Sequence, residues 1–576
     1  MPHRTTQLRP FSALREAIHD GYRLPHLRAD ILAGITVGII AIPLAMALAI
    51  ASGVAPQYGL YTAIIAGLLT PLTGGSRYSV SGPTAAFIVI LYPIASSYGL
   101  SGLLVATLMA GAMLVIMSIA RLGRLIEYIP EPVTLGFTSG IAVVIATLQI
   151  KDFFGLRLES LPESYLDKVV TLLQWLPATS PAELTVGLVT LLILLLWPRL
   201  KIAVPGHLPA IACGVAASLL LTAGGASVDT IGSRFHYLLE DGSSGFGIPP
   251  ILPQFQWPWL LPGPDGMPLQ WNLQLLISLL PAAFSIAMLG AIESLLCAVV
   301  LDGMSGKRHH SNGELLGQGV GNLIAPWFGG ITATAALARS AANFRAGARS
   351  PIAAMVHALV ILFSLLALAP WLSYIPMASM AAMLLVVAWN MSEAHKVSEL
   401  LRKAPNGDII VLLVCFSLTV LVDMVVAISV GIVLAALLFM REIASMTKVT
   451  DISDNPKHVP EPLPPGWAIY KISGPLFFAA ADRIFVELEQ RATDHSGVVL
   501  YMDGVTILDA GGLSALRHFL AFAADSGKRV IIADLQFQPL RTVAKSGLQP
   551  ITDQLAFTAT LAEGVAMVQS SQRAMD

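Results

Sequence analysis

From about residue 30 to residue 441, the chain alternates long apolar runs with short polar breaks. Several runs reach the roughly 20 residues that a helix needs to cross a bilayer. The pattern predicts an α-helical polytopic membrane protein with fourteen spanning segments. They lie near 30–51, 57–73, 83–98, 101–120, 132–150, 184–198, 207–224, 272–301, 312–328, 333–346, 352–370, 375–392, 408–424 and 425–441. The first run is too long for the apolar part of a signal peptide, so we expect it to remain as a helix.

Composition supports a membrane protein. Hydrophobic residues make up 55% of the 576 residues and charged residues 12%, about half the roughly 25% of soluble proteins. These values exclude a disulfide scaffold, a disordered chain and a basic nucleic-acid binder. The net charge of −2 gives no information about partners. Cys213, Cys297 and Cys415 lie in apolar runs without paired spacing, so we expect neither a disulfide nor a metal site.

The distribution of basic residues gives a separate test of the segment count, because cytoplasmic loops are enriched in Lys and Arg. With a cytoplasmic N-terminal segment at 1–28, the predicted inner loops hold twelve basic residues and the outer loops four. The inner ones are Arg77, Arg121, Arg124, Arg199, Lys201, Lys307, Arg308, Arg345, Arg349, Lys396, Arg402 and Lys403; the outer ones are Lys151, Arg157, Lys168 and Arg234. We therefore expect an even number of spans and both chain ends in the cytoplasm.

The C-terminal part has a different pattern. After the predicted transmembrane domain at 29–445, residues 446–465 carry five prolines and predict a stiff linker. Residues 466–576 then alternate apolar strands with amphipathic helices, which predicts a small cytoplasmic α/β domain. The strands are expected at 467–473, 497–502 and 528–534, and the helices near 479–493, from Gly511–Gly512 onward, and near 537–546.

Charges inside apolar segments are costly and usually face a cavity or the bundle interior. Glu293 lies in the middle of the eighth segment and Arg339 in the tenth, whereas Asp423 is close enough to a segment end to lie at the interface. An ion pair that braces two helices would explain Glu293 and Arg339. We favour a transport site, because two unusual segments lie nearby in the pattern.

The third and tenth segments are short, and both begin in polar sequence rich in Gly, Pro and Thr. Each is expected to be extended backbone followed by a half-helix, the usual signature of a transporter's binding site. Their seven-segment offset predicts two seven-helix repeats of inverted topology. Two helix N-termini contribute roughly +1 of charge, and Arg339 adds one more, which favours a small anion. The expected substrate-binding residues are Pro83, Thr84, Ala85, Thr334, Ala336, Leu337, Ala338 and Arg339.

Glu293 is the expected proton-coupling residue. A deprotonated carboxylate would weaken the attraction of the site for an anion, whereas a protonated one would not, so proton and anion would bind cooperatively and move by symport. No catalytic, metal or nucleotide motif occurs in a fitting context, so we expect neither an enzyme nor a bound cofactor.

Several motifs resemble the sulfate permease (SulP) family with a C-terminal STAS domain, over nearly the whole chain from residue 28. They are AGITVGIIAIP (33–43), GVAPQYGLY (53–61), SVSGPTAAF (79–87), YIPEPVTLGFTSG (128–140), NGELLGQGVGN (312–322) and FGGITATAALARSAAN (328–343). The resemblance implies a core of segments 1–4 and 8–11, a gate of segments 5–7 and 12–14, a homodimer and elevator-like movement. Within the family, 280–304 and 387–397 resemble a bacterial dicarboxylic acid transporter most closely.

Three positions depart from patterns common in the family. Leu44 replaces a glutamine that lines the substrate site in many members, which argues against simply assigning sulfate. Cys297, one turn after Glu293, is a poor sodium ligand, which favours protons. In the STAS domain, Ala510 follows Asp509 where phosphorylated relatives carry a serine, so we expect no phosphorylation at this loop.

The prediction is therefore proton symport of small dicarboxylates, of the succinate, fumarate or aspartate type, across a bacterial inner membrane. A cytoplasmic partner of the STAS domain stays open. The alternatives are a transporter of sulfate, bicarbonate or chloride, a passive anion channel, and a membrane-anchored regulator whose active part is the STAS domain.

Overall fold

The computed structural model describes residues 10–124, 129–158, 161–162, 164–200, 205–238, 244–264, 266–269, 272–459 and 462–573. Lys201, Pro460 and residues 1–9, which entered the predictions above, lie outside these ranges. The chain divides into two compact units, Met1–Ile432 and Val433–Asp576, and each is described by itself.

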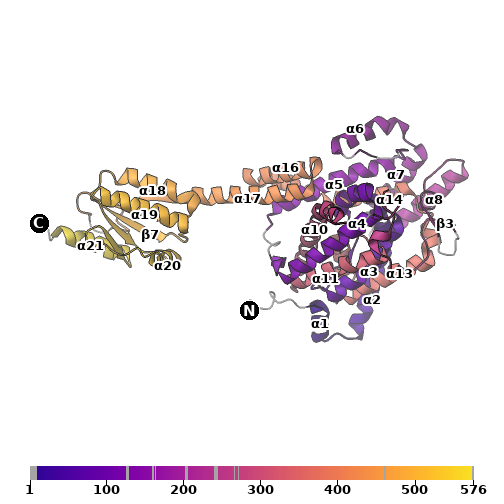
Figure 1. The fold of residues 1–576 in the computed structure, drawn as a ribbon, viewed down its shortest axis with the longest axis horizontal. Helices are drawn as coiled ribbons and strands as arrows, with labels where there is room; N and C mark the ends of the chain where they lie inside the picture. The colour runs from indigo at the N-terminus through magenta and orange to yellow at the C-terminus, as the bar shows by residue number, and fades with distance from the viewer. Residues whose placement is uncertain are drawn as a thin grey trace. The chain divides into compact units, whose positions relative to one another are not determined.

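Each of the fourteen predicted segments corresponds to a helix or half-helix of the described chain (Figure 1). Among the described residues, eight helices are long and apolar enough to cross a membrane, and α8 and α16 are shorter apolar helices. The elements that match the predicted segments are α2 (Leu24–Ala51), α3 (Pro56–Thr73), α4 (Ile88–Ile119), α5 (Glu131–Phe153), α7 (Pro181–Leu196), α8 (His207–Ala223), α10 (Leu273–Ser305), α11 (Ser311–Ile324), α12 (Leu337–Arg345), α13 (Ile352–Leu372), α14 (Met377–Met391), α16 (Asn406–Leu421) and α17 (Met424–Met446).

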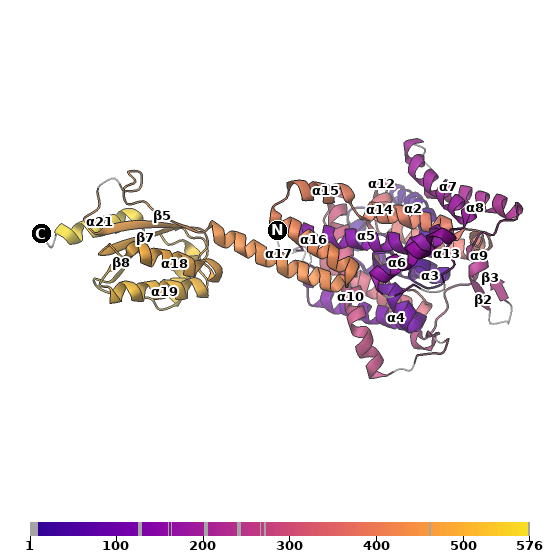
Figure 2. The ribbon, with the colours of Figure 1, turned by 90° about the horizontal axis from the view of Figure 1, so that it is seen from above.

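The helices of the first unit pack in two groups. Helices α2, α3, α4, α10, α11, α12 and α13 contact one another, with α11 against α3 and α4, and α13 against α2 and α3. In the other group, α5 packs against α14 and α16, and α7 against α8 and α14 (Figure 2). The family resemblance implies that segments 1–4 and 8–11 form a core and segments 5–7 and 12–14 a gate, and this division of roles stays a prediction.

Four described helices of the first unit are missing from the predictions, namely α1 (Ser12–His19), α6 (Tyr165–Trp175), α9 (Ile231–Arg234) and α15 (Ala394–Lys403), and α21 (Leu561–Arg573) of the second unit is missing as well. All of them are short and carry charged residues, so a search for apolar runs overlooks them. In α15, the apolar residues Val397, Leu400 and Leu401 recur at the spacing of one helix face, with charged residues between them. Asp423, predicted to be interfacial, lies between α16 and α17, where its carboxylate accepts hydrogen bonds from the N–H groups of Val425 and Val426.

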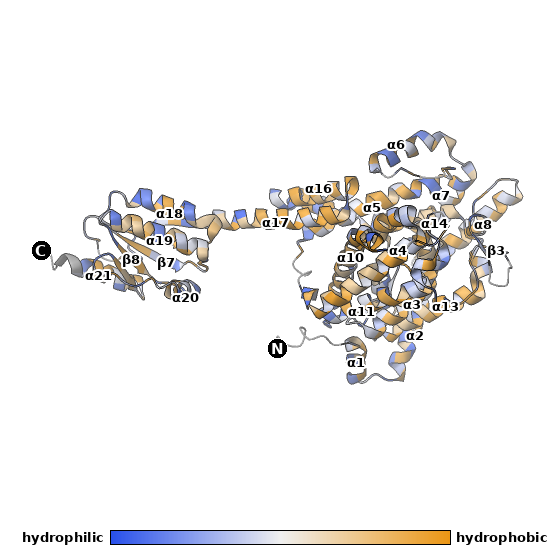
Figure 3. Cartoon of the chain, viewed as in Figure 1, coloured by the Kyte–Doolittle hydropathy of each residue, from blue (hydrophilic) through white to orange (hydrophobic). Residues whose placement is uncertain are grey.

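The second unit is built on a five-stranded sheet of order β5-β6-β7-β8-β9. Strands β6 (Trp467–Ser473), β7 (Gly497–Gly504), β8 (Arg529–Ala533) and β9 (Leu555–Thr558) are parallel. The helices are α18 (Phe478–Ala492), α19 (Ala510–Asp525), α20 (Phe537–Lys545) and α21 (Leu561–Arg573). The predicted strands and helices are confirmed to within a few residues. Hydrophilic residues are frequent on α18, whereas the helices of the first unit are largely hydrophobic (Figure 3).

The prediction of a linker from residue 446 is wrong for β5 (Lys448–Asp451), which pairs antiparallel with β6. The prolines that suggested a linker all follow this strand, because the first of them is Pro456. Val449 is buried and its neighbours are exposed, so β5 is a short edge strand with one apolar face.

Candidate functional site

The two short segments meet as a two-stranded antiparallel sheet inside the first unit, which we call the hairpin although no turn joins its strands. Strand β1 (Ser81–Gly82) precedes the helical turn at Ala85–Phe87 and α4, while β4 (Thr334–Ala335) precedes α12. Ser81 pairs with Ala335 and Gly82 with Thr334. Extended backbone followed by a half-helix is confirmed for both segments. We call β1, β4 and the first turns of the helices that follow them the hairpin site.

Helix α4 includes both the third and the fourth predicted segments, and Gly99 separates them. The residue has φ 66° and ψ −168°, a backbone conformation that interrupts the helix and that glycine adopts without steric cost. The first part of α4 is therefore a half-helix whose N-terminus follows β1. The N–H groups in the first turn of this half-helix and those in the first turn of α12 both lie next to the paired strands, which is the arrangement that an anion site requires.

The predicted binding residues all lie in the hairpin site, but with different exposure. Pro83, Thr84, Ala85 and Thr334 are buried, and Ala336 is half-buried. Leu337 and Ala338, in the first turn of α12, are exposed. The accessible backbone of the site is therefore on the α12 side.

Arg339 is 3% exposed, and its side chain crosses from α12 to the other half of the hairpin. Its Nη2 donates a hydrogen bond to the carbonyl oxygen of Pro83, whereas Nε and Nη1 have no partner among the described residues. A methyl group on Gly82 would lie 2.7 Å from Nη1, so the guanidinium occupies space that only glycine leaves. The sequence placed Arg339 in the site but did not indicate the role of Gly82.

Glu293 lies on α10 and is partly exposed. Its carboxylate accepts a hydrogen bond from the hydroxyl of Thr84, with an oxygen–oxygen distance of 3.0 Å. No ion pair joins Glu293 to Arg339 in the part of the chain that the structure describes, which disfavours the alternative of a bracing salt bridge. The guanidinium therefore keeps a positive charge that no carboxylate in contact neutralises.

Polar residues of two neighbouring helices, which the sequence analysis did not single out, hold β4. On α10, Ser294 hydrogen-bonds the hydroxyl of Thr334 at 2.7 Å, and the same hydroxyl contacts the carbonyl oxygen of Gly290 at 3.1 Å. On α11, Asn322 contacts the backbone next to β4. Ser294 follows Glu293 directly, and a search for hydroxyl residues beside the intramembrane carboxylate could have found it.

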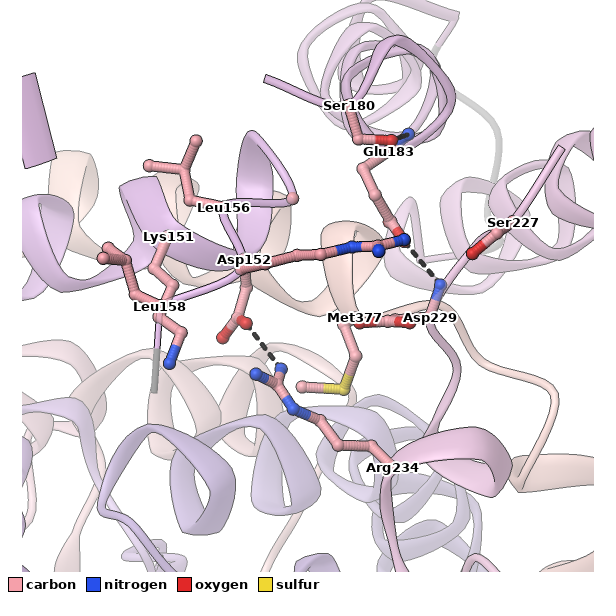
Figure 4. Close-up of a pocket in the computed structure, with 12 residues that line it drawn as sticks. Lys151, Asp152, Leu156, Leu158, Ser180, Glu183, Ser227, Asp229, Arg234 and Met377 are labelled. Atoms are coloured by element: carbon pink, nitrogen blue, oxygen red, sulfur yellow. Dashed lines mark hydrogen bonds and ion pairs between the residues drawn. The ribbon is translucent and has the colours of Figure 1, made fainter. Parts of the chain in front are cut away.

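A second polar centre lies where α5, α7 and α14 come together (Figure 4). Here Arg234 forms a 2.6 Å ion pair with Asp152, and Glu183 accepts a hydrogen bond from the N–H of Asp229 at 2.5 Å. A cavity of about 80 Å³ lies among these residues. We call Asp152, Glu183, Asp229 and Arg234 the α7 polar cluster. None of the predicted site residues lines this cavity.

Two family models match the chain. Residues 27–415 match the sulfate permease family, and residues 460–564 match the STAS domain. The candidate sulfate transporter YvdB of Bacillus subtilis is 39% identical over 92% of this chain and 95% of its own length. The bicarbonate transporter BicA of Picosynechococcus is 28% identical over 90% of this chain and 91% of its own. These relatives give no support to the closer likeness with a dicarboxylic acid transporter.

The fold is also shared with a solved structure. The murine anion transporter Slc26a9, in the inward-facing state, superimposes with a TM-score of 0.81 over 97% of this chain and 94% of its own, at 18% sequence identity. At this identity the likeness shows the fold alone. It agrees with the predicted helical membrane domain followed by an α/β domain.

Proposed function

Because the chain belongs to the sulfate permease family and has a STAS domain, we propose that it is a secondary transporter of a small inorganic anion, with sulfate and bicarbonate as the first candidates. YvdB and BicA, which match over most of their length, are named for transport of these two anions. The proposal replaces dicarboxylate as the first choice and includes no enzymatic activity.

The observation that carries the proposal is the hairpin site itself. Two helix N-termini begin beside one pair of strands, and a buried guanidinium without a carboxylate partner lies between them. Helix N-termini and an unneutralised arginine attract an anion in an apolar environment, where charge interactions are poorly screened. We assign backbone groups at Pro83–Ala85 and Ala336–Ala338 to substrate binding and Arg339 to anion attraction.

We assign proton coupling to Glu293. Its carboxylate contacts Thr84, which belongs to the proposed substrate backbone, so a change in its charge would act directly on the anion site. Protonation would remove the repulsion between carboxylate and anion, and the two ligands would then bind together. The partial exposure of Glu293 supports a path for the proton from water.

The remaining parts of the proposal concern the assembly. We infer an elevator-like movement of the α2–α4 and α10–α13 group against the α5–α8 and α14–α17 group, in a homodimer in the bacterial inner membrane. The N-terminal segment and the STAS domain would face the cytoplasm, where the STAS domain would meet a partner.

A dicarboxylate stays the second candidate because of one residue. Leu44, which stands where many family members have a glutamine, is half-buried on α2. An apolar wall here would tolerate the carbon chain of succinate better than the hydration shell of sulfate.

Counterflow in proteoliposomes tests the proposal. Vesicles loaded with unlabelled sulfate, bicarbonate or succinate receive trace labelled anion outside, and only a transported anion drives accumulation of the label. We expect sulfate or bicarbonate to do so. Succinate as the sole effective anion would transfer the proposal to dicarboxylates. Uptake that equilibrates without any counterflow would indicate a channel, and uptake of no anion would favour a regulator.

A further inference from the structure

Apart from Asn322, the motif NGELLGQGVGN at 312–322 has no role in the site assigned above, yet it forms most of α11 and carries a regular polar pattern. His310, Glu314, Gln318 and Asn322 are each four residues apart, so they follow one face of the helix. All four are at most 6% exposed. A buried polar stripe in a membrane helix is costly unless each group finds a partner.

Glycines on α11 let neighbouring backbones come close to this stripe. A methyl group on Gly317 would lie 2.6 Å from the Cα of Gly74, just beyond α3. One on Gly319 would lie 2.8 Å from the backbone nitrogen of Val115 in α4. Helix α11 is therefore wedged between α3 and α4, where small residues allow close packing. The polar side chains of α11 consequently come within hydrogen-bonding distance of the paired strands and the residues next to them.

Two residues of the stripe, Gln318 and Asn322, bind the two halves of the hairpin. The Nε2 group of Gln318 donates to the hydroxyl of Ser81 in β1 at 2.8 Å. Asn322 binds the residue directly before β4 at two points, since its Oδ1 accepts from the N–H of Ala333 and its Nδ2 donates to the carbonyl oxygen of Ala333, both at 2.8 Å. One helix thus contacts both halves of the hairpin.

The hairpin needs such support because it contains only two residue pairs. A two-stranded ribbon of this length has little stability of its own. The positions of the two helix N-termini relative to each other therefore depend on what holds β1 and β4. Glu314 extends the support, because its carboxylate accepts from the N–H groups of Gly75 and Ser76, and from Gln318 at 3.3 Å.

We propose that Gln318 and Asn322 are positioning residues for the transported anion: they fix the separation of β1 and β4, and thereby aim the amides in the first helical turns after these strands at one point. The inference rests on the proposed function of the hairpin site. Neither residue contacts the accessible backbone of Ala336–Ala338, so both act through the strands.

Asn322→Ala and Gln318→Ala are the test variants, and Ser81→Ala removes the partner of Gln318 with little change in volume. Thr190→Val is the matched control, because it removes a buried 2.8 Å hydroxyl contact with Ser379 between α7 and α14, away from the hairpin. All are compared with the wild type in detergent for monodispersity and Tm, and in proteoliposomes for uptake.

We expect KM for the transported anion to rise about tenfold in Asn322→Ala and Gln318→Ala, the scale of one lost buried hydrogen bond, with little change in kcat. Thr190→Val should lower Tm without moving KM. In a double-variant cycle, Ser81→Ala should add almost nothing to Gln318→Ala, because both remove the same contact. An unchanged KM, additive effects, or an equal KM shift in Thr190→Val would overturn the proposal.

Hydrogen–deuterium exchange gives a readout that needs no transport. Peptides covering 79–87 and 331–340 should exchange faster in Asn322→Ala than in the wild type, while Thr190→Val leaves them unchanged. Equal protection in Asn322→Ala and wild type would refute the positioning role. If the wild type transports none of the tested anions, but these peptides still exchange faster in Asn322→Ala than in the wild type, only the proposed function is refuted.

Discussion

The hairpin site and the α7 polar cluster each place a glutamate in an apolar helix, but they hold the carboxylate differently. Glu293 is partly exposed and accepts from a side-chain hydroxyl, that of Thr84. Glu183 is 5% exposed and accepts from a backbone N–H, that of Asp229. A hydroxyl can rotate away when the carboxylate changes charge, whereas a backbone group is fixed by the fold. Burial of a carboxylate therefore does not by itself identify a coupling site.

The arginines of the two centres also differ in how their charges are paired. Arg234 is paired with Asp152, and its charge is neutralised within the cluster. Arg339 is more deeply buried, and within the described ranges its guanidinium bonds only to the carbonyl oxygen of Pro83. The α7 polar cluster thus connects helix ends through a neutralised pair, while the hairpin site contains a guanidinium without a carboxylate partner among the described residues, as the proposed anion site requires.

The largest expected effect comes from the two arginines. Arg339→Gln should lower the initial rate of anion uptake about 100-fold, because it removes a charged donor from an apolar site. Arg234→Gln breaks an ion pair that contributes to folding, so it should lower Tm and leave uptake by the folded protein within about twofold. Uptake of labelled anion per folded protein in proteoliposomes measures both. Equal losses of uptake in Arg339→Gln and Arg234→Gln would mean that the two centres do not differ in their role in transport.

The two glutamates give the next test. Glu293→Gln should abolish accumulation driven by an imposed pH gradient while counterflow persists, because glutamine is neutral at every pH. Glu183→Gln should retain full accumulation, since its amide oxygen can still accept from Asp229. The steady-state ratio of internal to external label, with and without the gradient, separates the outcomes. Full pH-driven accumulation in Glu293→Gln would exclude its coupling role.

Gly82→Ala tests the geometry of the hairpin site with a single methyl group. Because that methyl would meet Nη1 of Arg339, the guanidinium must move, and we expect uptake to fall about tenfold with a smaller change in Tm. Gly303→Ala on α10 is a suitable control, because a methyl group there has open space around it. Unimpaired uptake in Gly82→Ala would show that the position of Arg339 does not matter.

Much of the hairpin site could be predicted from the sequence, but the α7 polar cluster could not. Apolar runs predict the spanning helices, and the Gly, Pro and Thr residues before the third and tenth segments predict the broken ones. Glu293 and Arg339 stand out because charge is costly in the middle of an apolar segment. Glu183 does not stand out, because an acidic residue in the first turn of a helix is favourable on general grounds.

The supporting contacts could not be predicted for a different reason. Gln318 and Ser81 are 237 residues apart, and nothing in either local pattern indicates that they meet. The four-residue spacing of the α11 stripe shows a shared face but not what it faces. Likewise β5 is too short for its periodicity to exceed the background of a polar loop, whereas α15 has an amphipathic pattern that a search for apolar runs overlooks.

The smallest effect is expected at a third group of charges, which surrounds the half-exposed carboxylate of Asp20 outside the apolar helices. The carboxylate of Asp20 accepts from Lys307 and Arg77, each at 2.8 Å, and these contacts lower its pKa from 3.8 to about 2. Because the pKa is lowered by folding, the stabilisation is complete above pH 3.8 and is lost only as the pH falls toward 2. Between pH 5 and 8 it should therefore be constant. Asp20→Asn should cost less than about 1 kcal/mol, since the side chains of Asp20 and Lys307 are about half exposed and screened by salt, although that of Arg77 is largely buried. Tm measured at pH 5 and pH 8, in low and high salt, checks this. A loss in Asp20→Asn as large as that in Arg234→Gln would mean that the exposure of the Asp20 carboxylate does not limit the strength of its ion pairs.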